Sequence, residues 1–387
     1  MLSGLRADPV LTIHRRLLWI SCQPLIWRLP MQLFATFRWL SYGVWWNSFK
    51  CIKKITDEKL TEYNITRWHV WCDLIRLGCL HALSPYQYFQ HKLYQKTQQA
   101  LMFHFIYDHQ QVHFHRYINN QCINHQVSMR LISDKYQFEQ ALRKISIPTV
   151  PSQYVDTKAL KQDISLFFQR KTIFCKPNAS SQSQDAFLLK YESQQNQYIL
   201  QAIKGQLLDD YQTICNYLKG AIARHAGFLI QPFIMDHEQI KTNPMMTTTV
   251  RIITAKMLPT SKPVVIYLKF EIPSADHTYK PMPLHWELLD LDPNYQKKYP
   301  LYAEQREITP EIKDLLRLSQ CYCIDAHDKL LDLRSVAFDI ILSQEGPCIL
   351  EANYNWHLAV LYQVLPDNPL HIDNKHPAAQ WLRQLFF

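Results

Sequence analysis

Two short apolar runs near the C-terminal end carry acid and amide groups where a buried strand normally has none. Residues 338 to 342 and 347 to 352 are rich in β-prone side chains, which predicts two short strands. The residues between them, 344 to 346, read as a three-residue hairpin loop with glycine in the left-handed position. Such a loop pairs Ser343 with Pro347 and fixes which residues face each other across the hairpin.

Counting outward from that pair places Asp339 opposite Glu351 on one face of the hairpin, and Asn353 shares that face. Two facing carboxylates repel each other, and a buried carboxylate without a partner is costly. We therefore predict a cation between them, and donors that are all oxygen favour Mg²⁺ or Mn²⁺. The alternative is that both acids lie at strand ends in water.

Phosphate groups usually complete the coordination of Mg²⁺ in such sites, so the chain should also contain phosphate-binding residues. Its seven glycines are spaced so that neither GxGxxG nor GxxxxGK[ST] occurs, which excludes a Rossmann dinucleotide motif and a Walker P-loop. A phosphate site in this chain must use side-chain cations and groups carried on strands.

Composition limits the class of protein. A length of 387 residues predicts two or three packed lobes, and ten cysteines without a CxxC pair suggest reduced thiols and a cytoplasmic location. The excess of 42 basic over 33 acidic residues favours anionic partners. No zinc-finger spacing, RNA-binding signature or lysine-rich tract is present, so we expect no nucleic-acid partner.

Residues 10 to 55 interleave tryptophans with arginines and lysines. Charges interrupt every apolar stretch before it reaches the 18 or so residues that a membrane-spanning helix needs. One interpretation is peripheral contact with an anionic membrane at the inner face. The other is an ordinary helical lobe with buried tryptophans.

The remaining pattern predicts an α+β protein built mainly on antiparallel sheets. We expect a mostly helical N-terminal region at 1–125, a first mixed lobe at 126–230 and a second at 231–387. The predicted strands cover residues 172 to 176, 186 to 191, 228 to 234, 248 to 256 and 264 to 272. One predicted helix ends at residue 144, and two others cover residues 207 to 226 and 310 to 321.

The order of motifs resembles the ATP-grasp superfamily, whose fold consists of two α+β lobes that grip a nucleotide. The motifs are Asp134-Lys135 before a helix, Phe174-Cys-Lys176-Pro177, Leu229-Ile-Gln231-Pro-Phe-Ile234, Thr249-Val-Arg251 and the acidic hairpin. The runs Gln231 to His237, Thr249 to Thr254 and Gly346 to Asn353 most closely resemble the sugar-transfer-associated ATP-grasp branch.

This resemblance assigns ATP phosphates to Lys176 and an earlier lysine, for which Lys135 is the candidate. An ammonium that points inward from a strand suits phosphate as a point charge, although Lys176 at a strand end in solvent is the alternative. In the same family pattern Gln231, Phe233 and Ile234 contact adenine, and Glu238 matches the ribose-binding position. Without the resemblance, Phe233 and Ile234 are simply core residues.

Arg251 interrupts a strand of apolar and hydroxyl side chains, where an inward guanidinium needs an anion. A phosphate or acyl phosphate is one such anion, with Lys269 as a second cation for it. An ion pair with Glu271 is the alternative. The loop after Lys176, residues 178 to 185, contains no glycine, whereas this loop is glycine-rich in most ATP-grasp enzymes.

These features together predict an ATP- and Mg²⁺-dependent ligase that activates a carboxylate as an acyl phosphate and joins it to an amine or similar nucleophile. The resemblance suggests a glycan-linked acceptor in cell-surface polysaccharide biosynthesis. A kinase on the same fold and an inactive ATP-binding adaptor at the membrane surface are the alternatives.

Overall fold

The computed structural model describes residues 37, 39–81, 83, 85–100, 102, 105–106, 108–168, 171–179, 185–202, 207–241, 247–273, 279–284, 308–358, 361 and 376–386. The chain divides into unit 1, Met1–Gln121 with Asn355–Phe387, and unit 2, Cys122–Tyr354. The domain borders that we placed at 125 and 230 stay predictions. The segment from Asn355 onward, which we had placed in the second lobe, groups with the N-terminal helices.

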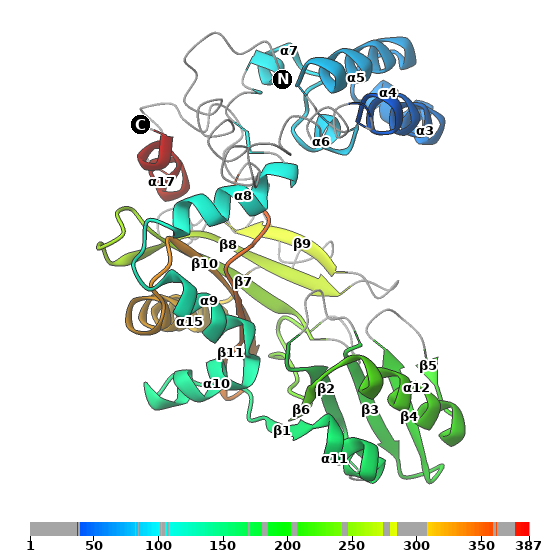
Figure 1. Cartoon of the computed structure of the whole chain (residues 1–387), viewed down its shortest axis with the longest axis vertical. Helices are drawn as coiled ribbons and strands as arrows, with labels where there is room; N and C mark the ends of the chain where they lie inside the picture. Colours follow the sequence, from blue (N-terminus) through cyan, green and yellow to red (C-terminus); the bar gives the residue numbers. More distant parts are fainter. Residues whose placement is uncertain are drawn as a thin grey trace, which may run out of the picture. The chain divides into compact units, whose positions relative to one another are not determined.

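Unit 1 is helical in its described residues, as predicted for the N-terminal region. Its core is formed by buried side chains such as Val70, Leu77 and Tyr88. Near the C-terminal end of the chain, the Trp381 ring packs edge-on against Phe114 with centroids 6.2 Å apart. The elements are η1 (Trp39–Trp46), α3 (Asn47–Lys54), α4 (Asp57–Glu62), α5 (Arg67–His81), α6 (Pro85–Gln90), α7 (Lys96–Ala100), α8 (Asp108–Asn119) and α17 (Pro377–Phe386) (Figure 1).

Unit 2 contains two antiparallel sheets. The first has the strand order β1-β6-β2-β3-β4-β5, and α11 (Thr157–Gln162) and α12 (Tyr211–Arg224) cover one of its faces. Alternate residues such as Cys175 and Ile230 pack against these helices, so Lys176 and Gln231 lie on the opposite face. The strands are β1 (Gln153–Asp156), β2 (Ile173–Pro177), β3 (Phe187–Glu192), β4 (Gln197–Ala202), β5 (Leu207–Leu208) and β6 (Gly227–Pro232).

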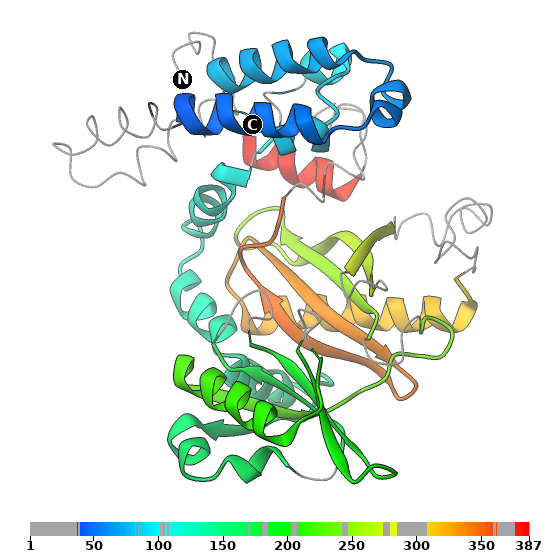
Figure 2. The same ribbon diagram turned by 90° about the vertical axis from the view of Figure 1, so that its right-hand side faces the viewer.

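The second sheet has the order β11-β10-β7-β8-β9, and the long helix α15 (Pro310–Leu330) covers one of its faces (Figure 2). Val250, Ile252 and Phe338 belong to the core cluster shared with this helix. Arg251 and Asp339, at the intervening positions, therefore lie on the other face. The strands are β7 (Thr249–Lys256), β8 (Pro263–Pro273), β9 (Tyr279–Leu284), β10 (Ser335–Ser343) and β11 (Gly346–Asn353). The two sheets confirm the predicted α+β class.

The predicted strands agree with β2, β3, β6, β7 and β8 to within one or two residues. Strands β1 and β4 were not predicted, and β9 lies in a segment that we expected to be irregular. The segment from Leu207 begins as the short strand β5 rather than as helix, and α15 continues to Leu330. Helix α9 (His125–Ser133) precedes α10 (Lys135–Lys144), which ends where predicted.

The acidic hairpin differs from the prediction in its turn. Ser343 pairs with Gly346, so the loop has two residues and the predicted Ser343–Pro347 pair is wrong. Gly346 does have the positive φ that we expected, +121°. The register then shifts by one at Leu350, which has no partner on β10, and Asp339 faces Glu351 as predicted. A β-bulge therefore restores the pair that the shorter turn would otherwise have displaced.

Candidate active site

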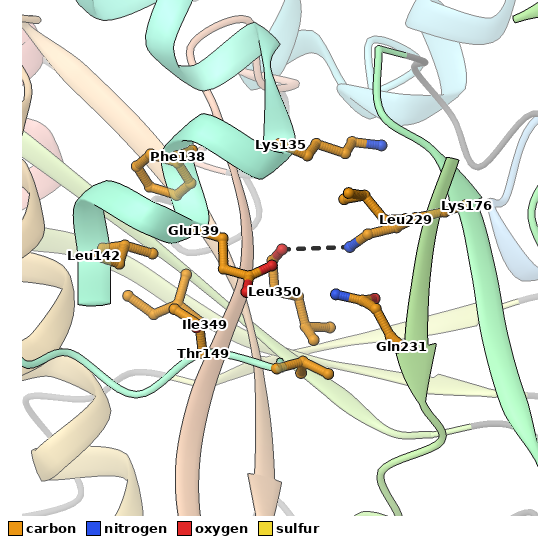
Figure 3. A pocket seen from close by; sticks show the side chains of 11 residues that line it. Lys135, Phe138, Glu139, Leu142, Thr149, Lys176, Leu229, Gln231, Ile349 and Leu350 are labelled. Carbon is orange, nitrogen blue, oxygen red and sulfur yellow. Dashed lines mark hydrogen bonds between the residues drawn. The ribbon is translucent and has the colours of Figure 1, made fainter. Parts of the chain in front are cut away.

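A pocket in unit 2 is lined by α10, by β2 and β6 of the first sheet, and by β11 of the second (Figure 3). Two lysine side chains, Lys135 and Lys176, extend into it from α10 and β2. The other lining residues are Phe138, Glu139, Leu142, Thr149, Val150, Leu229, Gln231, Ile349 and Leu350. The pocket therefore joins the motif lysine of one sheet to the acidic hairpin of the other.

Lys176 is buried in this pocket, with 7% of its surface exposed. Its Nζ donates to the carbonyl oxygen of Leu350 at 3.4 Å, the contact drawn in Figure 3. Burial lowers the pKa of Lys176 to about 8, and Glu351 only partly opposes this effect. The alternative of a lysine exposed at a strand end is therefore wrong, and the ammonium has too little negative charge around it.

Lys135 is the first residue of α10, and its Nζ lies 3.4 Å from Glu351 Oε2. Asp134 caps the helix, because its Oδ1 accepts from Gln137 N at 3.0 Å. The cap fixes the start of the helix and so sets where the Lys135 side chain leaves the backbone. The structure thus brings Lys135 and Lys176, the two predicted phosphate lysines, to one pocket.

Asn178 is a residue of this site that the sequence analysis did not identify. Its Oδ1 accepts from Tyr136 N at 2.9 Å, and its Nδ2 donates to Asp134 Oδ1 at 3.0 Å. One side chain thus links the segment directly after Lys176 to the N-terminus of α10. The only signal in the sequence was its position two residues after the motif lysine.

Four charged residues form one row across the second sheet. Glu351 on β11 pairs with Asp339 on β10, which pairs with Arg251 on β7, which pairs with Lys269 on β8. All four lie on the face opposite α15, because paired residues of neighbouring strands share a face. The predicted metal-binding acids and the predicted catalytic cations are therefore neighbours in a single register.

Arg251 and Asp339 form a two-bond ion pair, with Nε to Oδ1 at 2.7 Å and Nη2 to Oδ2 at 2.9 Å. Glu271 Oε1 lies 3.2 Å from Arg251 Nη1 and 2.7 Å from Lys269 Nζ. The ion pair with Glu271 that we gave as the alternative for Arg251 is present, and Asp339 adds a closer one. Burial lowers the pKa of Arg251, but Asp339 and Glu271 outweigh it and raise that pKa above its ordinary value.

Asp339 is itself 7% exposed, which rules out the alternative of a strand end in water. Burial raises its pKa to about 6, although the neighbouring Arg251 guanidinium acts in the opposite direction. For Glu351, burial also raises the pKa, but Lys135 and Lys176 outweigh it and leave the pKa below its ordinary value. The facing carboxylates therefore have different environments, and Glu351 is the more readily ionised of the two.

The two acidic side chains and Asn353 are the residues that we predicted as ligands of a hard divalent cation. Asn353 Nδ2 lies 3.4 Å from both Asp339 Oδ2 and Glu351 Oε1, so the three groups converge. Among the residues described here, no three His, Cys, Asp or Glu side chains gather at one point, and it is the amide nitrogen of Asn353, not its oxygen, that faces the two carboxylates. The assignment of Asp339, Glu351 and Asn353 to a metal ion stays a prediction. Both oxygens of Asp339 already bond Arg251, so an ion at this position shares that carboxylate with the guanidinium.

Of the residues assigned to adenine and ribose, Gln231 lies in β6 and the other three follow this strand. Gln231 lines the pocket and donates from Nε2 to Ser152 Oγ at 2.6 Å. Phe233 and Ile234 are half-buried, and the Ile234 carbonyl accepts from the Thr247 hydroxyl at 3.0 Å. Glu238 is exposed and does not line the pocket. The assignments of these four residues to nucleotide contacts stay predictions.

Comparison with known proteins gave two negative results and one positive result. No protein-family model matches the chain. No curated protein matches it. Solved structures do match, among them the D-alanine-D-alanine ligase from Helicobacter pylori at 14% identity and a TM-score of 0.41, covering 66% of this chain and 60% of that one.

Two further matches are the ADP complex of N5-carboxyaminoimidazole ribonucleotide synthetase and the ATP-grasp ligase PsnB with a minimal precursor. The first has 12% identity and a TM-score of 0.37 and covers 60% of this chain and 47% of that one. The second has 14% identity and a TM-score of 0.34 and covers 67% and 60%. The chain therefore spans about half to three fifths of the length of these structures.

An ATP-grasp ligase is thus among the solved structures similar to this chain. All three TM-scores lie below 0.5, so we infer neither an activity nor a substrate from these matches. The assignment to the sugar-transfer-associated branch stays a prediction from the sequence.

Proposed function

We propose that unit 2 is a Mg²⁺- or Mn²⁺-dependent ligase of the ATP-grasp type, with ATP bound at the pocket of Figure 3. One observation carries the proposal: the two motif lysines meet the acidic hairpin. Lys135 Nζ is 3.4 Å from Glu351 Oε2, and Lys176 Nζ is 3.4 Å from the carbonyl oxygen of Leu350. Two lysines that suit phosphate therefore lie beside the hairpin whose carboxylates suit a divalent ion.

In this proposal Lys135 and Lys176 bind the ATP phosphates. Asp339, Glu351 and Asn353 hold the divalent ion, which when bound neutralises charge on the β- and γ-phosphate oxygens. Arg251 and Lys269, in the same row, offset negative charge that develops on the transferred phosphoryl group. The buried position of Lys176 strengthens its attraction for phosphate, because little water surrounds it.

The proposed reaction has two steps. An oxygen of a substrate carboxylate attacks the γ-phosphorus of ATP, and the bond from that phosphorus to the β–γ bridging oxygen breaks to release ADP. An amine then attacks the acyl carbon, a C–N bond forms, and inorganic phosphate leaves while the amine loses a proton. Arg251 and Lys269 are positioned to orient the anionic groups in both steps.

The place of this reaction in the cell rests on the sequence alone. The resemblance to the sugar-transfer-associated branch supports an acceptor linked to cell-surface polysaccharide biosynthesis, and the cysteine content supports a cytoplasmic location. Both are parts of the proposal. Two other readings, a kinase and an inactive adaptor, are outcomes that the experiments below separate.

The first test is binding of the nonhydrolysable ATP analogue AMPPNP, measured by calorimetry with and without Mg²⁺. We expect binding that strengthens with Mg²⁺ and that loses this dependence in Glu351→Gln. The matched control is Glu345→Gln, an exposed acid in the turn of the same hairpin, which should behave as the native protein. Absence of Mg²⁺-dependent binding in the native protein, or its persistence in Glu351→Gln, contradicts the proposed site.

The second test identifies the reaction. Purified protein is incubated with ATP, Mg²⁺ and panels of carboxylic acids and amines, and ADP and phosphate are measured separately. A ligase releases both in equal amounts. Release of ADP with a phosphorylated product indicates a kinase, and AMPPNP binding without any turnover indicates an adaptor. Either result replaces the ligase proposal.

A further inference from the structure

Exposed aromatic rings are concentrated in one part of unit 1. Among the residues that the structure describes, the tryptophans and phenylalanines with large exposed surfaces all fall between positions 37 and 68. Trp45, Trp46 and Phe49 are 53%, 46% and 43% exposed, and Trp68 is 72% exposed. The exposed large apolar residues of unit 2 are aliphatic residues, tyrosines and a methionine, which are scattered along its sequence. Such a concentration of exposed rings marks a contact surface.

These rings belong to adjoining helices. Trp45, in η1, packs edge-on against Trp71 of α5 with ring centroids 6.1 Å apart. Trp68 lies one helical turn before Trp71 on α5 and is exposed. Trp46 and Phe49 follow Trp45 into α3 and stack on each other with centroids 6.2 Å apart. The exposed aromatic residues therefore lie on neighbouring elements, and ring contacts hold Trp45, Trp46 and Phe49 in place.

Two lysines lie among these rings. Lys50 Nζ is 5.1 Å from the centre of the Trp46 ring, and Lys53 Nζ is 4.5 Å from the centre of the Phe49 ring. Both lysines are exposed, and no carboxylate of the described residues forms an ion pair with either. We call Trp45, Trp46, Phe49, Lys50, Lys53 and Trp68 the aromatic–lysine patch.

We propose that the aromatic–lysine patch docks on the surface of an anionic phospholipid bilayer. Tryptophan and phenylalanine rings insert at the boundary between headgroups and acyl chains, while lysine ammonium groups bind lipid phosphates above them. A protein partner fits less well, because the centre of a protein interface is depleted in lysine. No helix of the described residues has the length and apolar character to cross a bilayer.

Most of the aromatic–lysine patch lies within residues 10 to 55, the segment for which we predicted a membrane contact, and Trp68 lies outside it. Of that segment, residues 10 to 36 and Arg38 lie outside the described residues, and the proposal does not depend on them. It is also independent of ATP binding by unit 2. Failure of one proposal therefore leaves the other standing.

The test uses the full chain and sedimentation with vesicles of phosphatidylcholine alone or of phosphatidylcholine mixed with phosphatidylglycerol. We expect the protein to pellet with the anionic vesicles at low salt and to be released at high salt. Lys50→Glu with Lys53→Glu should weaken the partitioning at least about tenfold, since each lysine near an anionic surface contributes about 1 kcal/mol. The matched control is Lys158→Glu with Lys161→Glu, two exposed lysines with the same spacing on α11.

A second pair of variants tests the aromatic residues. Trp46→Ser with Phe49→Ser should weaken binding to anionic vesicles about as much, whereas Ile123→Ser with Val127→Ser, two exposed apolar residues of unit 2, should not. Circular dichroism checks that each variant is folded, which is expected because the changed side chains are exposed. Light scattering without vesicles shows whether any variant changes the oligomeric state.

Four results overturn the proposal. The first is no pelleting of the native protein, and the second is equal pelleting with neutral and anionic vesicles. The third is unchanged binding in folded patch variants, which would assign any membrane contact to other residues. The fourth is a change from dimer to monomer in the patch variants without an effect on vesicle binding, which would identify the patch as an interface between two copies of the chain.

Discussion

The two sheets of unit 2 are built alike but differ in how a cation on the face away from the helices is neutralised. Each sheet packs one apolar face against helices and turns charged or polar side chains to the other. On the first sheet, Lys176 has a backbone carbonyl as its hydrogen-bond partner at 3.4 Å, and burial lowers its pKa to about 8. On the second, two bonds to Asp339 and a contact with Glu271 raise the pKa of Arg251.

This difference separates two positive charges by how far the protein neutralises them. Asp339 and Glu271 largely neutralise Arg251, so it contributes to the folded structure before any ligand binds, in addition to the role in phosphoryl transfer that we propose for it. Lys176 is incompletely neutralised, so an anion that enters the pocket gains most from it. Four measurements test this difference between the two sheets.

The largest effect on stability is expected for Arg251→Met. The change leaves Asp339 as a buried carboxylate without its main partner, which costs about 3–5 kcal/mol of unfolding free energy. Urea denaturation at pH 8 measures the loss. The matched control is Arg224→Met, which removes a guanidinium bound through two similar bonds to Asp185 at 2.9 and 2.8 Å but half exposed, so the cost should stay near 1 kcal/mol or below.

A double variant tests the cause of that loss. Arg251→Met with Asp339→Leu removes both charges, so most of the lost stability should return. A loss below about 1 kcal/mol in the single variant, or no recovery in the double variant, would show that the ion pair does not stabilise the second sheet.

Lys176→Met should give the opposite result. We expect AMPPNP affinity to fall by roughly 10- to 150-fold, because a hydrogen bond to a charged group contributes about 1.5–3 kcal/mol. The free energy of unfolding should be unchanged or higher at pH 7, since the ammonium is desolvated. Lys190→Met, on β3 of the same sheet and paired with Glu192, is the control and should bind normally. Normal nucleotide binding or a clear loss of stability in Lys176→Met would remove the distinction between the sheets.

A histidine of α15, the helix that covers the second sheet, predicts a dependence of stability on pH. His327 is fully buried, its Nε2 lies 2.9 Å from the carbonyl oxygen of Leu333, and its Nδ1 lies 2.7 Å from the Thr254 hydroxyl. Burial lowers its pKa to about 3. The folded protein therefore favours the neutral ring, and the unfolded chain, with an ordinary pKa near 6.5, binds the proton first.

The stability that His327 contributes is consequently full above pH 6.5 and is lost as the pH falls from there towards 3. The loss is about 1.4 kcal/mol per pH unit. Unfolding free energies of the native protein and His327→Gln at pH 7, 6 and 5 measure it, and the difference between the two isolates this group from other titrating residues. Parallel pH profiles would show that His327 does not titrate on unfolding.

The smallest effect is expected for Asn178→Ala, which removes the link between β2 and α10. Loss of its side-chain hydrogen bonds should cost about 1 kcal/mol of stability. If Asn178 also positions Lys135 and Lys176, AMPPNP affinity should fall several-fold while adenosine affinity stays the same. Asn216→Ala, at an exposed position on α12, serves as the control. An equal loss for both ligands would assign Asn178 a purely structural role.

Several parts of the site followed from local patterns in the sequence. The motif around Lys176 identified it as a candidate phosphate lysine, and alternation along the strand placed Asn353 on the same face as Glu351. The absence of suitable glycines excluded two phosphate-binding motifs. Asp339 was placed opposite Glu351, but by a count in which an overlong turn compensated for a bulge that was not foreseen. Such properties depend on residues close in the chain, where side-chain chemistry and period are directly visible.

Other features required the tertiary structure. The pair between Arg251 and Asp339 joins residues 88 positions apart, and the contact of Lys176 with Leu350 spans 174. The sequence alone cannot show that either contact forms in place of an alternative, such as the ion pair between Arg251 and Glu271, because it does not show which strands are neighbours. The bond of Asn178 to the helix cap and the grouping of the C-terminal segment with unit 1 have the same origin.

The sequence by itself thus determined the kinds of side chain available and the face of each strand on which they lie, because alternation is a local property of the backbone. Only the tertiary structure decided which charges neutralise each other and which remain for a ligand. That outcome depends on strand order, on one unpaired residue at Leu350 and on burial, all of which arise from packing between distant parts of the chain.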